Sequence, residues 1–270
     1  MIIFRKLTLA IAVILSLLNT SCSSDNNLDN SSNEQMSVNT ENFSRNSELW
    51  RTMELSNAEI KQMASDHNKY LTKIFDETYD FNSNKTENEQ FTEIKIDLIR
   101  EFSTASEEQA YNEFFDNVRN INLEDLLEND FEKDYVQNIK SVLYSSSNHQ
   151  ELSNNLDIII TIIDNDERDF FKTPLKLYAE TIKESAFYWW PTEIGGSGIG
   201  YEVMQKRGKA ITRTAMNRAA ETDAKALSGG MIGIAAYGTW GVLFGPVGFA
   251  LTGASFIGVV VGSAFASAVF

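Results

Sequence analysis

Residues 229–270 read GGMIGIAAYGTWGVLFGPVGFALTGASFIGVVVGSAFASAVF, and this stretch contains no Asp, Glu, Lys or Arg. Ten of the protein's 15 glycines lie in it. Small residues recur in it at intervals of four, a spacing that on a helix forms one groove and lets another helix backbone approach closely. We expect helix packing along this stripe, which consists of Gly229, Gly233, Gly241, Gly245, Ala250, Ala254, Gly258, Gly262 and Ala266.

Pro246 divides the stretch into two parts. Proline has no N–H to donate and its ring clashes with the preceding turn, so we expect a hairpin turn at Pro246 between helices at about 230–244 and 247–269. The first helix is short for a membrane span, whereas the second meets the requirement of about 20 residues. Their large apolar side chains need either lipid or the apolar faces of other helices to cover them. Membrane contact is the expectation, and burial inside the protein is the alternative.

The segment directly before this stretch, residues 201–228, is basic. It carries six Lys and Arg against three Asp and Glu, so its net charge is 6 − 3 = +3, whereas the whole chain carries −15. We expect a basic helix here, suited to an anionic headgroup surface or, equally, to packing against an acidic bundle. The acidic remainder of the chain argues against nucleic acid as a partner, because phosphate binding depends on Lys and Arg.

Glycine and proline are missing from most of the chain before this region. No glycine occurs before Gly195 and no proline before Pro174. A β-sandwich or barrel would need both at its many turns, so the sequence predicts an all-α fold. We expect an amphipathic helical bundle at 51–190 that folds without the rest, a glycine hinge and the basic helix at 191–228, and the C-terminal apolar helical hairpin at 229–270.

Capping boxes mark three helix starts in the predicted bundle. A serine or threonine with Glu or Gln three residues later is such a box, and the pattern occurs at Ser56, Thr86 and Ser106. After Ser56 the apolar residues follow helical spacing, which predicts a helix at about 57–80.

Three further helices are expected toward the end of the bundle. Thr173-Pro174 predicts a cap with proline at the first helical position, opening a helix at about 174–190. The segments 123–145 and 150–165 are also expected to be helical. Within the latter, residues 158–163, IIITII, favour a strand by propensity, but we interpret them as a buried helix because no partner strand is visible elsewhere.

Two short motifs connect the bundle to the basic segment. Residues 187–190, FYWW, are interpreted as an aromatic plug in the core, with an interfacial belt at the headgroups as the alternative. Residues 195–200, GGSGIG, resemble phosphate-binding loops only superficially, because no strand precedes them and no Gly-Lys-Ser/Thr follows. We interpret them as a flexible hinge.

The N-terminus has the pattern of an export signal. Residues 1–22 combine Arg5 and Lys6, an apolar run and small residues before Cys22, which is the only cysteine of the chain. This position resembles the lipobox of bacterial lipoproteins, although Asn19 stands where leucine is usual, and a plain cleaved signal is the alternative. We expect lipidation at Cys22. Residues 23–50 are polar and predict a disordered tether.

The sequence contains no convincing catalytic or metal site. Only His67 and His149 are present, so a zinc site of nitrogen and sulfur ligands cannot be assembled, and we interpret His67 as a structural residue on an apolar helix face. Residues 80–84 resemble the start of an EF-hand loop, but the glycine and the glutamate that complete such a loop are missing. In residues 164–169, a second acidic cluster, Arg168 stands at a ligand position. We expect no metal, no cofactor and no enzymatic activity.

Two stretches together resemble a group of uncharacterised Bacteroidota lipoproteins. One is residues 67–71, HNKYL; the other is the C-terminal third, with 187–190, then 221–230, ETDAKALSGG, then the glycine zipper with its central proline. The resemblance implies an exported lipoprotein and no particular activity. From the N-terminal signal and its sequel we expect a location in the cell envelope, at the outer membrane or the cell surface. The apolar hairpin makes membrane lipid the expected partner, with self-association through the small-residue stripe as an option.

A weaker likeness concerns pore-forming bacteriocins, in which amphipathic helices wrap an apolar helical hairpin until it meets a membrane. Only this layout matches. The expected function is therefore that of a non-enzymatic cell-envelope lipoprotein whose hairpin associates with a membrane or packs on itself. A membrane-inserting, toxin-like protein is the alternative.

Overall fold

The computed structural model describes most of the chain after residue 54, and the described part is all-helical, without a β-strand. The predicted all-α class is therefore confirmed for this part. The described residues are 55–102, 108, 112, 115–116, 123–127, 129–237, 260–265 and 268.

Helix α3 (Asn57–Lys73) begins where the first capping box predicts. The Glu59 N–H donates to Ser56 Oγ at 3.3 Å, and the Glu59 carboxylate accepts from the Ser56 N–H at 2.9 Å. The helix continues into one π turn, η2 (Ile74–Thr78). The helix predicted at 57–80 is confirmed, but its last turn is wider than an α-helical turn.

Helix α4 (Glu87–Phe102) begins at the second predicted box. The Glu89 N–H donates to Thr86 Oγ1 at 3.3 Å, and the Glu89 carboxylate accepts from the Thr86 N–H at 2.7 Å. Both boxes thus satisfy two backbone donors that a helix start leaves without intrahelical partners. The third box, at Ser106, lies outside the described residues.

The helix expected at 123–145 is divided into two pieces. Residues Leu123–Leu126 form a short 3-10 turn, η4, and the α-helix α6 (Asp130–Ser145) begins only after Asn129. The Asn129 N–H donates to the Glu132 carboxylate at 3.1 Å, which is a local N-terminal cap. This cap sets the start of α6 seven residues later than predicted.

Residues 158–163 are helical, as interpreted, and belong to α7 (His149–Asn165). They are not all buried, however. Ile160 and Ile163 face the core with Leu156, whereas Ile158 and Ile162 are 58% and 51% exposed. The helical period divides the isoleucines between two faces, so α7 is amphipathic and the prediction of a buried helix is wrong for its outer face.

Helix α8 (Lys172–Trp189) begins before Pro174, where the sequence predicts the first helical position. Phe171 is the residue that precedes the helix, and its N–H donates to Glu132 Oε1 of α6 at 3.0 Å. Glu132 is fully buried. A carboxylate 39 positions away in the chain therefore supports the helix start, and Pro174 lies inside the first turn, where its missing N–H has no intrahelical acceptor anyway.

The last described helices depart from the predicted boundaries. After a short 3-10 turn, η5 (Thr192–Ile194), come α9 (Ile199–Lys206) and α10 (Arg213–Tyr237). The basic helix expected at 201–228 is thus two helices, interrupted at Gly208, whose φ of 65° ends α9. The helix expected to begin at about 230 is instead the last part of α10. No proline or left-handed residue interrupts the chain within Arg213–Tyr237, so the two expected helices are continuous.

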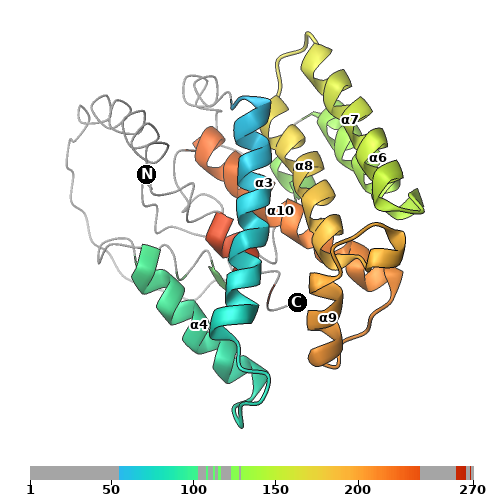
Figure 1. Ribbon diagram of the computed structural model, residues 1–270. Coiled ribbons are helices and arrows are strands. Elements are labelled where there is room, and N and C mark those ends of the chain that lie inside the picture. Colours follow the sequence, from blue (N-terminus) through green and yellow to red (C-terminus); the bar gives the residue numbers. More distant parts are fainter. Residues whose placement is uncertain are drawn as a thin grey trace, which may run out of the picture.

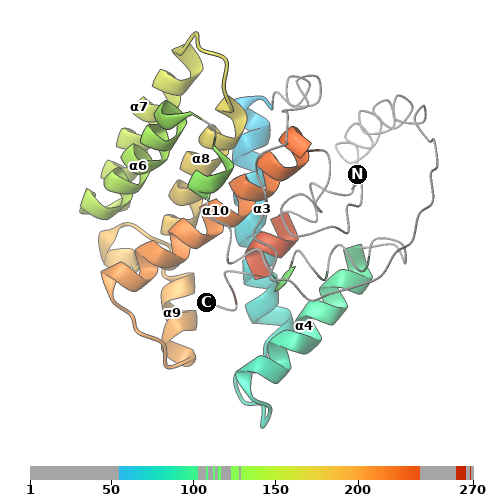
Figure 2. The ribbon, with the colours of Figure 1, turned by 180° about the vertical axis from the view of Figure 1, so that it is seen from behind.

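Helix α8 lies at the centre of the bundle. Helices α3, α7 and α10 pack along it, α6 and α9 contact it, and most of its residues are buried. Helices α6 and α7 lie side by side on one flank, α4 lies on the opposite side of the molecule, and α10 crosses α3 and α8 from behind (Figures 1 and 2). The core therefore forms around α8, against which other helices pack on several sides.

The aromatic motif at the end of α8 is a core plug, as interpreted. Tyr188, Trp189 and Trp190 are at most 2% exposed, and only Phe187 faces outward, at 43%. Both indoles donate to α10, Trp189 Nε1 to Asp223 Oδ2 and Trp190 Nε1 to Asn217 Oδ1, each at 3.0 Å. Helix α10 is thus part of the same core as 51–190, which was expected to fold without it.

The glycine-rich residues 195–200 form a closely packed turn and not the open loop that a hinge requires. The N–H groups of Gly196, Ser197 and Gly198 donate to carbonyls at the end of α8 and in the two residues that follow it, the last of them to Trp190 at 3.1 Å. A Cβ at Gly196 would lie 2.0 Å from the Trp190 carbonyl oxygen. Only glycine fits here, because the neighbour is backbone and cannot move aside.

We expect Gly196→Ala to destabilise the protein by about 3 kcal/mol or more, above the usual range for overpacking, because the added carbon meets backbone. Gly208→Ala is the matched control. Gly208 also ends a helix, but nothing lies within 4 Å of its Cβ position. Its substitution should cost about 1 kcal/mol, from the positive φ alone. Denaturant unfolding of both variants checks this, and equal losses would contradict the packed turn.

Candidate functional site: where the C-terminal segment docks

An aromatic cluster forms where η2 meets α4. The π turn places Tyr79 with its ring centroid 4.9 Å from that of Phe81 and 5.2 Å from that of Phe91, and the Phe75 ring lies 5.8 Å away. These separations are those of favourable aromatic pairs. We call Phe75, Tyr79, Phe81 and Phe91 the aromatic cluster.

Arg207, the residue that ends α9, reaches into this cluster. Its guanidinium carbon lies 5.2 Å from the Phe91 ring centroid and 5.5 Å from that of Phe75, and its side chain is only 2% exposed. Such distances allow cation–π attraction. Its Nε donates to Glu87 Oε1 at 2.6 Å. A buried guanidinium therefore has both a carboxylate partner and aromatic faces around it.

Glu87 receives a second cation. Lys209 Nζ lies 3.1 Å from Glu87 Oε2, so that the first residue of α4 binds both sides of the turn at Gly208. Burial raises the pKa of Glu87, but the hydrogen bonds from Lys209 and Arg207 outweigh burial and hold that pKa below its ordinary value. The carboxylate is ionised at neutral pH and compensates the buried charge of Arg207.

The described end of the charge-free stretch packs against this site. We call residues 260–265 and Ala268 the C-terminal segment; all are buried. The Phe265 ring centroid lies 6.1 Å from that of Phe91 and 5.1 Å from that of Phe115. Arg207 Nη1 donates to the Ala268 carbonyl at 2.6 Å. Both views place this segment, red, between α10 and α4 (Figures 1 and 2).

This burial bears on the expected membrane contact. The large apolar face expected to contact lipid includes Val260 and Val261, which are 5% and 0% exposed and are covered by protein. None of the helices that the structure describes combines the length and the apolar composition that crossing a bilayer requires. In its described part, the stretch therefore follows the alternative, burial inside the protein.

The predicted helix-packing residues are only partly described. Gly229 is buried on α10, Gly233 lies on the same helix, and Gly262 is buried in the C-terminal segment. The remaining residues of the stripe and the predicted turn lie outside the described residues: Gly241, Gly245, Pro246, Ala250, Ala254, Gly258 and Ala266. Cys22, the signal at 1–22 and the tether at 23–50 also lie outside them.

Four of the six cations of the basic segment contact other groups of the protein, whereas Lys206 and Arg218 are exposed. Besides Arg207 and Lys209, Arg213 lies with its guanidinium carbon 3.4 Å from the Trp190 ring centroid and donates to the Ser146 carbonyl at 2.8 Å. Lys225 lies 2.8 Å from Glu221 of the same helix. Packing against an acidic bundle, one of the two open interpretations of this segment, is what the structure has at Arg207 and Lys209, and Arg213 packs on the bundle through a ring and a carbonyl.

A second charged cluster lies between α6 and α10. Glu221 accepts from the Tyr144 hydroxyl at 2.9 Å, and Lys140 Nζ lies 3.0 Å from its other oxygen. Burial, followed by the hydrogen bond to Glu221, raises the pKa of Tyr144 to about 12. Burial also raises the pKa of Glu221, but the hydrogen bonds from Lys225 and Lys140 outweigh it and lower that pKa.

We expect this cluster to make the protein sensitive to alkali. Tyr144 ionises at about 10 when unfolded but at about 12 in the fold, so the stability it contributes is complete below pH 10 and is lost as the pH rises from 10 toward 12. Urea unfolding at about pH 9 and about pH 11 measures the loss. Tyr144→Phe should lose less stability over the same range than the parent, and identical losses would refute the assignment.

In the acidic motif at 164–169, which was considered as a metal site, two carboxylates are ion-paired. Asp164 lies 2.7 Å from Lys176 Nζ, and Asp166 is bound by the guanidinium of Arg168. Throughout the described part of the chain, no group of three or more His, Cys, Asp or Glu side chains could hold a metal ion. His67 is fully buried on α3, as expected for a structural residue.

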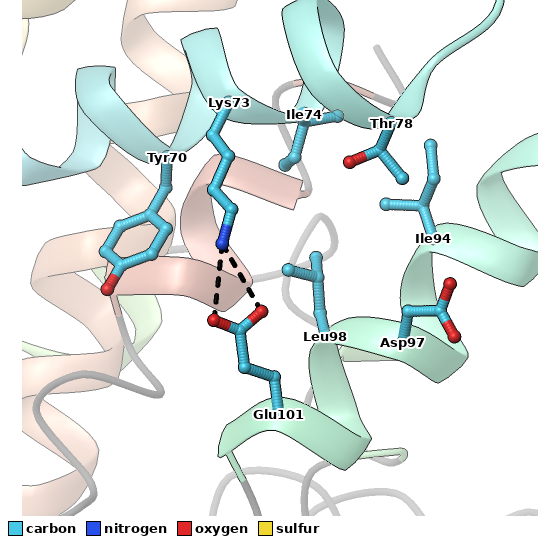
Figure 3. Close-up of a pocket in the computed structure, with 8 residues that line it drawn as sticks. All are labelled: Tyr70, Lys73, Ile74, Thr78, Ile94, Asp97, Leu98 and Glu101. Atoms are coloured by element: carbon cyan, nitrogen blue, oxygen red, sulfur yellow. Dashed lines mark hydrogen bonds and ion pairs between the residues drawn. The ribbon is translucent and has the colours of Figure 1, made fainter.

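A small pocket lies between α3 and α4 (Figure 3). Its volume is about 50 Å³, enough for a few water molecules and well below the roughly 300 Å³ of small-molecule sites. Lys73 reaches from α3 to Glu101 of α4, at 3.2 Å, and crosses the gap between the helices. Its lining mixes Ile74, Ile94 and Leu98 with these charges, an arrangement that suits a structural crevice.

The chain matches no protein-family model, no curated protein and no solved structure. What the protein does must therefore be inferred from its own residues.

The sequence did not single out Arg207, which the structure places at the centre of the site. It appeared as one of six cations in a basic helix. The signal that could have distinguished it is the following Gly208, since a glycine after a cation commonly ends a helix. Its partners Glu87 and Ala268 are 120 and 61 positions away in the chain, and no local pattern predicts such pairs.

Proposed function

We propose that the protein is a non-enzymatic cell-envelope lipoprotein, anchored through Cys22, whose helical bundle shelters a charge-free C-terminal stretch from water. The observation that carries this proposal is the burial of residues 260–265 and Ala268 against the bundle. The hairpin of 229–270, with its turn at Pro246 and its glycine zipper, is part of the same proposal. So are the location at the outer membrane or cell surface and the possibility of self-association.

The chemistry of the described residues supports a binding or structural role over catalysis. The buried charges that the structure describes are engaged with one another: Lys183 with Glu180 at 3.0 Å, and Arg207 with Glu87 at 2.6 Å. Ionic groups committed in this way stabilise or specify a fold. The 50 Å³ pocket is also small for a substrate.

Lipidation at Cys22 is the first expected result. A lone cysteine directly after an apolar signal motivates it, and anchoring by several acyl chains is firm where one chain is weak. Cys22→Ala should abolish metabolic labelling with a fatty-acid probe, whereas Ser21→Ala should leave labelling intact. Labelling that persists in Cys22→Ala would refute the anchor. Membrane association alone does not decide it, because the C-terminal stretch could retain the protein there.

A second candidate function is insertion of the C-terminal stretch into a membrane. Two observations favour it. Residues 229–270 carry no charge, and Arg207 binds their described end at a backbone carbonyl, that of Ala268. Unacylated protein with Cys22→Ser should then release dye from vesicles of phosphatidylglycerol and phosphatidylethanolamine. Vesicles that stay intact would reject insertion and leave the lipoprotein proposal standing.

A further inference from the structure

We propose that Arg207 retains the C-terminal segment in the bundle, so that loss of its side chain frees the segment while the rest of the fold persists. This inference deepens the insertion proposal. Only the destination of the freed segment, a membrane, rests on that proposal. The retention itself is a property of the protein in water. It can therefore be tested without any membrane.

The geometry gives Arg207 a connecting position. From the end of α9, one side chain contacts Glu87 at the start of α4 and the carbonyl of Ala268, each at 2.6 Å. The bond to Ala268 is charge-assisted, a kind roughly twice as strong as a bond between neutral groups. The Arg207 and Lys209 N–H groups donate to the Val203 and Met204 carbonyls of α9 at 3.0 and 2.9 Å, which holds the turn at Gly208 against the end of that helix.

The site around Arg207 is complete without the segment. Glu87 and the rings of Phe75, Tyr79 and Phe91 belong to η2, α4 and the turn between them, and Lys209 also binds Glu87 at 3.1 Å. If Ala268 moves away, the guanidinium keeps its carboxylate and its aromatic neighbours. Departure of the segment thus leaves no uncompensated charge in the bundle.

The segment is held by burial of its apolar side chains, and Arg207 adds a directional polar bond to that burial. It carries no ionisable side chain, and its hydroxyl, Ser263 Oγ, donates to the Val260 carbonyl within the segment at 2.9 Å. The Phe265 ring packs on Phe91 and Phe115 of the bundle, and Arg207 binds the Ala268 carbonyl. Arg207 therefore stabilises the docked state and not the released one, which is the condition for shifting such an equilibrium.

The test measures access to the segment in solution. In the full chain with Cys22→Ser, which removes the only native thiol, Ser263→Cys places one near-isosteric thiol at a fully buried position. The readout is its labelling rate with a charged, water-soluble maleimide. Arg207→Met should raise the rate about tenfold or more, the factor expected from one hydrogen bond to a charged group.

Two controls separate release from unfolding. Ser185→Cys reports on α8 at another fully buried serine and should stay protected in Arg207→Met. Arg168→Met removes another guanidinium that lies over a ring, 3.8 Å from Phe131, and should leave the Ser263→Cys rate unchanged. Arg207→Lys, which keeps the charge and loses the planar fork, should give an intermediate rate.

An unchanged Ser263→Cys rate in Arg207→Met would overturn the proposal, and so would equal acceleration at Ser185→Cys. If Arg207→Met does not fold, Arg207→Lys decides by the same two rates. Vesicles of phosphatidylglycerol and phosphatidylcholine test the destination separately. Faster labelling without vesicle binding supports retention by Arg207 and rejects membrane insertion, whereas faster labelling in water that vesicles suppress supports both.

Discussion

Trp190→Ala is expected to destabilise the protein by about 3–5 kcal/mol, the range for removing a large buried aromatic side chain. Trp190 is fully buried, and its indole N–H donates to Asn217 of α10 at 3.0 Å. The substitution opens a cavity at the end of α8 and removes the hydrogen-bond partner of a buried amide oxygen. Thermal or denaturant unfolding of the purified variant measures the loss.

Phe187→Ala is the matched control for this substitution. Phe187 belongs to the same aromatic motif but is 43% exposed, and its ring lies against His149, at 5.3 Å between centroids. Its loss should stay below about 1.5 kcal/mol, the value of one aromatic pair. Similar losses for the two variants would mean that the motif is not a core plug, and that the interfacial interpretation deserves preference.

Lys183→Met is expected to destabilise the protein by about 3–5 kcal/mol, because it leaves a buried carboxylate without its nearest cation. Lys183 Nζ lies 3.0 Å from Glu180 Oε2, and the Glu180 side chain is 5% exposed. Lys183 also binds Asp157 at 2.6 Å. Burial lowers the pKa of Lys183, but the hydrogen bond to Asp157 and the charge of Glu180 outweigh burial and raise it.

Lys61→Met tests the same carboxylate from its exposed side. Lys61 Nζ lies 3.9 Å from Glu180 Oε1, and its side chain is 59% exposed, so the loss should be about 1 kcal/mol or less. Combining Lys183→Met with Glu180→Leu should recover much of the stability, since an apolar pair avoids the buried charge. A double variant as unstable as Lys183→Met would contradict the pairing.

Local signals in the sequence predicted the elements that depend on neighbours in the chain. The boxes at Ser56 and Thr86 form because each cap and its glutamate are three residues apart. The all-α class followed from missing glycine and proline for a similar reason, since turns depend on local backbone conformation. Residues 158–163 are helical because their isoleucines must serve two faces at once, one toward the core and one toward water.

Long-range contacts account for what the sequence did not predict. The start of α8 depends on Glu132, 39 positions before Phe171. The glycine turn at 195–200 is packed because it meets the end of α8, which composition alone cannot reveal. The charge of the basic segment left a headgroup surface and an acidic bundle equally open, and Arg207 is buried because Glu87 and aromatic rings from distant positions surround it.

The central claim is that the bundle shelters the C-terminal segment, and hydrogen–deuterium exchange on the lipid-free, unacylated chain tests it most directly. Amides of 260–265 should exchange slowly, within about tenfold of the buried amides of α8, because the segment is covered by the same core. Addition of denaturant should release both together. Exchange of 260–265 at the rate of an unstructured chain, while α8 remains protected, would contradict the claim.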